Sequence, residues 1–85
     1  KAESAGPPGI VRVVFTGIDS SEDFMRLSGY LQGMPVVRRI TPVRATPAGL
    51  EVDLDLATGM SGFRRLVDDD VLLDEEGEPP TFRLR

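Results

Sequence analysis

Three carboxylates stand at every second position of one short stretch of the chain. Glu51, Asp53 and Asp55 alternate with apolar residues across residues 50–56. A period of two places the two sets on opposite faces of a β-strand, one buried and one wet. Such carboxylates can form an acidic docking strip, or they can pair with arginines of a neighbouring strand. Arg38, Arg39 and Arg44 of the preceding segment are suitably placed for that pairing.

A second acidic run occupies residues 68–78, which hold seven carboxylates. Carboxylate oxygens suit a calcium ion, but the run lacks the D-x-D-x-D-G order and the closing glutamate of a known calcium loop. A solvated loop is the simpler interpretation, and the cation site remains the alternative. We expect no metal site and no cofactor.

Residue types needed for covalent catalysis are missing. The chain has no cysteine and no histidine, and its one lysine is Lys1. Its serines therefore lack a base, and zinc, copper and iron lack their usual ligands. The absence of asparagine also argues against an acylphosphatase-like site. We expect a protein that is not an enzyme, with Ser20 and Ser21 acting as helix caps rather than nucleophiles.

The periodicity of apolar residues predicts the elements that position these side chains. The expected strands are residues 10–16, 36–46, 50–56 and 81–85, and the expected helices are residues 20–33 and 58–69. Pro42 and the uneven spacing of Val37 and Ile40 indicate that the second strand is a bulged edge strand. Leu72 and Leu73 are expected to fold back under the second helix.

The first helix has clear sequence signals at both ends. Asp19 or Ser20 can cap it, and Pro35 cannot continue it. Its buried stripe is predicted at spacings of three and four by Phe24, Leu27, Leu31 and Met34. Thr58 is the expected cap of the second helix.

This β-α-β-β-α-β order predicts an α+β fold of the ferredoxin-like type. Such a two-layer sandwich has a four-stranded antiparallel sheet with both helices on one face. The first and third strands would be central, and the second and fourth would be edges. Residues 1–9 are interpreted as a linker and residues 10–85 as a single ferredoxin-like domain. The open sheet face and the edge strand then form a possible interaction surface of Arg12, Val14, Thr16, Arg38, Arg39, Glu51, Asp53 and Asp55.

Charge and length narrow the class of partner. The 85 residues carry a net charge of −4, with +2 in residues 1–49 and −6 in residues 50–85. A nucleic-acid-binding domain of this size is normally basic, so we expect no nucleic-acid partner. No apolar run approaches the length of about 20 residues that spans a bilayer, so we expect no direct membrane insertion by this fragment. The missing initiator methionine suggests a piece of a longer protein.

Part of the chain resembles a known family. The residues concerned run from Val11 through Gly17-Ile18-Asp19-Ser20 to the Tyr30-Leu31 pair, and then continue as Pro35-Val36-Val37-Arg38-Arg39-Ile40. Together they resemble the C-terminal modules of an uncharacterised family of Gram-negative envelope proteins. The resemblance covers about residues 10–73 and implies a periplasmic or cell-envelope location, but no catalytic residue.

Two functions remain as hypotheses. The first is a non-catalytic interaction or assembly module of a larger bacterial envelope protein, which binds a protein partner or a second copy of itself. The second is a small-ligand sensor like the amino-acid-binding ACT domains, which bind effectors near the loop after the first strand. Residues 17–21 form that loop here, although a helix cap explains them equally well.

Overall fold

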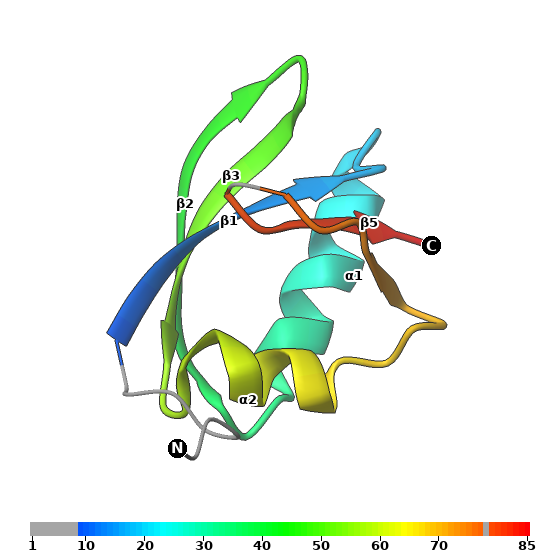
Figure 1. The fold of residues 1–85 in the computed structure, drawn as a ribbon. Helices are drawn as coiled ribbons and strands as arrows, with labels where there is room; N and C mark the ends of the chain where they lie inside the picture. The colour runs from blue at the N-terminus through cyan, green and yellow to red at the C-terminus, as the bar shows by residue number, and fades with distance from the viewer. Residues whose placement is uncertain (1–8, 78) are drawn as a thin grey trace.

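The computed structural model describes residues 9–77 and 79–85. The elements in chain order are β1 (Gly9–Thr16), α1 (Ser21–Gln32), β2 (Val37–Thr46), β3 (Gly49–Leu56), α2 (Gly59–Leu66), β4 (Leu72–Asp74) and β5 (Thr81–Leu84) (Figure 1). Residues 1–8 of the expected linker, and Glu78 of the acidic loop, lie outside the described residues.

The strands form one mixed sheet in the order β2-β3-β1-β5-β4. Neighbouring strands are antiparallel except for β1 and β5, which run parallel. The α+β class with two helices is therefore confirmed. The expectation of four strands, all antiparallel, is wrong, because the sheet has a fifth strand and one parallel pair.

The additional strand is β4, in the segment that was expected to fold back under the second helix. Leu72 lies opposite Leu84, and Asp74 opposite Phe82, so β4 and β5 form an antiparallel pair. Because the chain reverses between them, β5 runs parallel to β1 and lies inside the sheet rather than at its edge. A strand of three residues is too short for an alternating pattern to reveal it.

Strand β2 is the bulged edge strand that the sequence predicts. Within residues 9–77 and 79–85 it pairs only with β3, and its register shifts between Val37 and Arg39 and again between Pro42 and Arg44. Pro42 has no N–H to give to a ladder, and two bulges twist the edge further. These features protect an otherwise open strand of 10 residues from uncontrolled pairing.

Helix α1 begins at the predicted position. The Ser20 hydroxyl accepts a hydrogen bond from the Asp23 N–H (3.2 Å), and the Asp23 carboxylate accepts one from the Asp19 N–H (3.0 Å). Ser20 rather than Asp19 is therefore the cap. Two residues of the predicted stripe, Leu27 and Leu31, are fully buried.

Helix α2 is shorter than predicted, since it ends at Leu66 rather than Asp69. Val67 is extended, and the Asp68 N–H donates a hydrogen bond to the Tyr30 hydroxyl (2.7 Å). This hydrogen bond gives the Asp68 N–H a partner that does not belong to helix α2. Aspartates at a helix C-terminus also oppose its dipole, so continuing the helix would be unfavourable.

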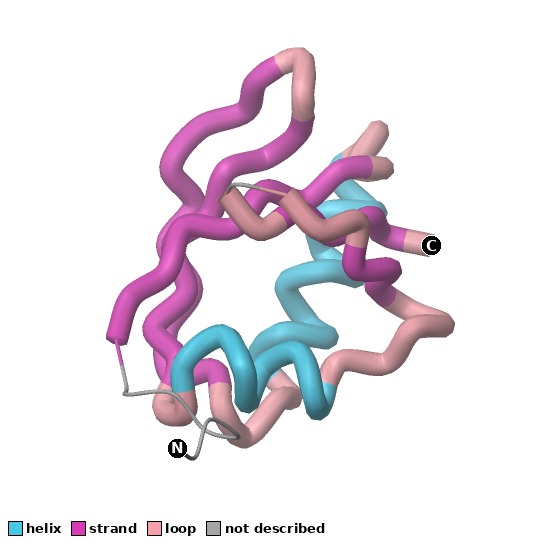
Figure 2. The backbone as a smooth tube through the Cα atoms, in the orientation of Figure 1, coloured by secondary structure: helices cyan, strands magenta, loops and turns pink. Residues whose placement is uncertain are grey.

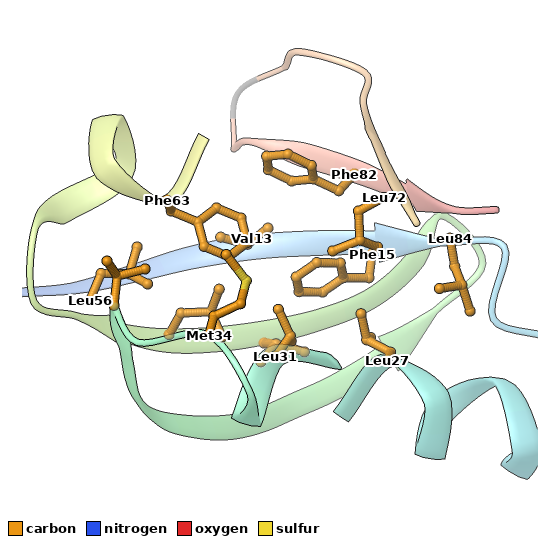
Figure 3. Close-up of a cluster of buried hydrophobic side chains, with 13 residues drawn as sticks. Val13, Phe15, Leu27, Leu31, Met34, Leu56, Phe63, Leu72, Phe82 and Leu84 are labelled. Atoms are coloured by element: carbon orange, nitrogen blue, oxygen red, sulfur yellow. The ribbon is translucent and has the colours of Figure 1, made fainter. Parts of the chain in front are cut away.

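Both helices pack against the same face of the sheet and close a single hydrophobic core (Figures 1 and 2). Leu31 of α1 and Phe63 of α2 meet the inward side chains of the strands there (Figure 3). The Phe63 ring lies edge-on to Phe82, with 5.3 Å between centroids, and Phe82 lies 6.2 Å from Phe15. The opposite face of the sheet has no helix over it among the described residues.

Candidate functional site: the outer face of the sheet

The residues predicted as an interaction surface lie on three adjacent strands, β1, β3 and β2. Register places Arg12 opposite Asp53, Val14 opposite Glu51, and Arg39 opposite Asp55. Side chains paired in this way point to the same side of a sheet, here away from the core. We call this side the outer face. Its predicted members are Arg12, Val14, Thr16, Arg39, Glu51, Asp53 and Asp55, with Arg38 reaching it from the first bulge.

Arg12 lies at the centre of the outer face and holds two carboxylates. Its Nε donates to Asp53 Oδ1 at 2.6 Å, and its Nη2 to Asp53 Oδ2 at 3.5 Å. Its Nη1 lies 3.5 Å from Glu51 Oε1. The planar guanidinium thus meets Asp53 with two nitrogens, a geometry that lysine could not reproduce.

These contacts also fix the charge state of Arg12. The pKa of its guanidinium is raised above the ordinary value, first by the hydrogen bond to Asp53 and then by the charge of that carboxylate. The charge of Glu51 raises this pKa further. An arginine is already cationic at every accessible pH, so the pairing does not act as a pH switch.

Two arginines of β2 also pair with carboxylates of β3. Arg38 Nη2 lies 3.0 Å from Asp55 Oδ1, and Arg44 Nε lies 3.2 Å from Glu51 Oε1. All three acidic residues of β3 are therefore paired. The predicted partners Arg38 and Arg44 hold Asp55 and Glu51, whereas Asp53 pairs with Arg12 of β1 rather than with Arg39. The side chains of the paired arginines remain half exposed, so each pair contributes little to stability, about 0–1 kcal/mol.

Two charged residues of the outer face were missed by the sequence reasoning. They are Glu75 and Arg83, which form an ion pair with 3.4 Å between Arg83 Nε and the Glu75 carboxylate. Glu75 also accepts a hydrogen bond from the Thr16 hydroxyl (3.4 Å). Arg83 lies beside Thr16 of β1, on the side of β5 that faces away from the core. Its neighbour could not be identified, because β5 was expected to run antiparallel to β1, whereas it runs parallel.

A separate hollow of about 310 Å³ lies between the β1–α1 loop and the β2–β3 turn. Residues 16–19 and Phe24 form one wall, and residues 45–50 form the other. Ile18, Pro47 and Leu50 make the lining partly apolar, while Asp19 supplies a carboxylate. The hollow adjoins the loop where the sensor hypothesis placed an effector.

The described residues contain no group of three or more acidic side chains arranged to hold a metal ion. Within the same residues, no helix is long and apolar enough to cross a membrane.

Comparison of the chain with known protein families, with curated proteins and with solved structures finds no match.

Proposed function

We propose that this chain is a non-catalytic interaction and assembly module of a larger bacterial envelope protein, and that the outer face of its sheet is the contact surface. The observation that supports the proposal is that, among the described residues, this face of the sheet is left uncovered. No helix covers it, and half-buried Val14 stands on its central strand beside fixed ion pairs. An ordered, uncovered sheet face of this kind suits binding a partner of complementary shape. The envelope location rests on the family resemblance alone.

We also propose that the fold is a ferredoxin-like arrangement with one added strand. Helix α1 connects β1 to β2, and in the sheet these two strands are separated by β3, which is antiparallel to both. This is the crossover of a ferredoxin-like fold. β4 follows α2 in the direction of the usual last strand, and β5 is inserted between β4 and β1.

Self-association tests the proposed function directly. We expect the mass in solution, measured by sedimentation over about a hundredfold range of concentration, to rise as the protein becomes more concentrated. Val14→Asp places an unpaired charge in the middle of the outer face and is expected to reduce the association. Met25→Asp is the matched control, since Met25 is 70% exposed on helix α1. Equal loss in both variants would count against the outer face.

The second candidate function is small-ligand sensing in the hollow between residues 16–19 and 45–50. The hollow itself favours this candidate, because it lies beside the loop after the first strand. A thermal-shift screen against amino acids and nucleotides tests it. A saturable shift that Leu50→Trp abolishes by filling the hollow would support a sensor, and no shift with any compound would reject it.

A further inference from the structure

Arg39 differs from every other arginine in the described residues. It is exposed and makes no hydrogen bond or ion pair with any residue of 9–77 or 79–85. The other arginines each interact with at least one group of the protein, such as a carboxylate or a backbone carbonyl. The outer face therefore contains one cation whose charge is not used within the described chain.

The first bulge of β2 explains why Arg39 has no carboxylate partner among the described residues. Register places Arg39 directly opposite Asp55, where it would be the expected partner. The bulge inserts Arg38 beside it, and Arg38 takes the Asp55 carboxylate at 3.0 Å. Arg39 instead borders a hollow of about 290 Å³, which is also lined by Gln32 and Ile40.

Two adjacent carboxylates that could complement Arg39 lie at the opposite edge of the sheet. Asp69 and Asp70 are exposed in the turn before β4, and neither side chain makes a hydrogen bond or ion pair with the described residues. β2 and β4 are the two outermost strands of the sheet. Four strand spacings separate them, about 19 Å, so this pair cannot form within one chain.

We propose that Arg39 binds the acidic turn at Asp69 and Asp70 of a second copy of this chain, which gives a head-to-tail contact between the β2 edge and the β4 edge. The inference rests on the proposed assembly function and names the partner and the contact. Such a contact uses two different surfaces of each chain, so it can continue from copy to copy.

The response to salt separates this contact from association through apolar groups. Each chain carries a net charge of −4, so copies repel one another and salt would strengthen an apolar contact. A contact made by Arg39 and aspartates is instead weakened, because the Debye length falls from about 14 Å near 50 mM salt to about 4 Å near 500 mM.

Sedimentation equilibrium of single and mixed variants at about 50 and 500 mM salt tests the inference. We expect wild-type association to weaken at high salt, and Arg39→Glu and the double variant Asp69→Asn/Asp70→Asn each to lose it at least about tenfold. A mixture of these two variants retains one intact interface and is expected to form a 1:1 dimer with wild-type affinity. Asp19→Lys is the charge control, because Asp19 is an exposed residue of the β1–α1 loop that belongs neither to the region of Arg39 nor to the turn at residues 69–70. Urea unfolding confirms that each variant folds.

Several results would overturn the inference. Association that survives Arg39→Glu but is lost in Val14→Asp rejects the head-to-tail contact and leaves the proposed function in place. Failure of the mixture to form a 1:1 dimer also rejects the contact, as does equal loss in Asp19→Lys. A chain that stays monomeric at both salt concentrations rejects the contact and self-association through the outer face together.

Discussion

Substitution of Gly62 by alanine is a sharp test of how helix α2 is packed. Alanine normally stabilises a helix by about 1 kcal/mol relative to glycine. Here a Cβ at Gly62 would overlap the hydroxyl oxygen of Thr58 and lie 2.5 Å from its Cβ. Thr58 precedes the helix, and its Oγ1 is buried with no hydrogen-bond partner among the described residues. The threonine side chain thus fills the space that glycine leaves open.

The magnitude follows from these opposing effects. Overpacking of this kind costs about 1–3 kcal/mol, because the first turn of α2 must move to accept the extra methyl. It outweighs the gain in helix propensity, so Gly62→Ala is expected to lower the free energy of unfolding by about 1–2 kcal/mol. A domain of 85 residues has only about 4–13 kcal/mol of stability, so the loss is readily measured.

Equilibrium urea unfolding, followed by circular dichroism, provides the assay. Gly29→Ala in α1 is the matched control, because no atom lies within 4 Å of the Cβ position at Gly29. This variant is expected to gain up to about 1 kcal/mol. Thr58→Gly combined with Gly62→Ala removes the overlap and is expected to recover part of the loss. A Gly62→Ala protein as stable as Gly29→Ala would refute the packing of Thr58 over Gly62.

Three further predictions concern the core and the outer face. Leu72→Ala should lower the free energy of unfolding by about 2–5 kcal/mol, since Leu72 is fully buried in β4. Leu66→Ala, at a 52% exposed site, should cost much less. Equal losses in urea unfolding would argue against β4 as a core strand. Thr58→Val keeps the shape and removes the unpaired hydroxyl, so thermal unfolding should show equal or greater stability, and a clear loss would reveal a hydrogen bond at that oxygen. Asp53→Asn weakens the contact to Arg12 and should lower the stability only slightly at low salt, with the difference shrinking in high salt. A salt-independent loss in urea unfolding would contradict an exposed pair.

Local patterns in the sequence were sufficient for most of the framework. The alternation around Glu51, Asp53 and Asp55 predicted β3 and its wet face, because the period of two in a strand is a property of the backbone itself. Ser20 and the apolar stripe predicted α1, and Pro42 with its uneven neighbours predicted a bulged edge at β2. These signals act within a few residues of one another.

The end of the chain could not be predicted in the same way. Leu72 and Leu84 pair only because the chain reverses between β4 and β5, and short strands depend on their neighbours for stability. The end of α2 at Leu66 likewise depends on Tyr30, which is distant in sequence and accepts the hydrogen bond from Asp68.

The sequence by itself determined which residues of β1 and β3 face outward, since alternation is local and needs no partner. Only the tertiary structure decided how those charges are shared, because pairing depends on register between strands. The first bulge of β2 brings Arg38 to the carboxylate of Asp55, so Arg39 has no ion-pair partner among the described residues. The strand order then places Arg39 and the free carboxylates of Asp69 and Asp70 at opposite edges of the sheet, too far apart to meet within one molecule.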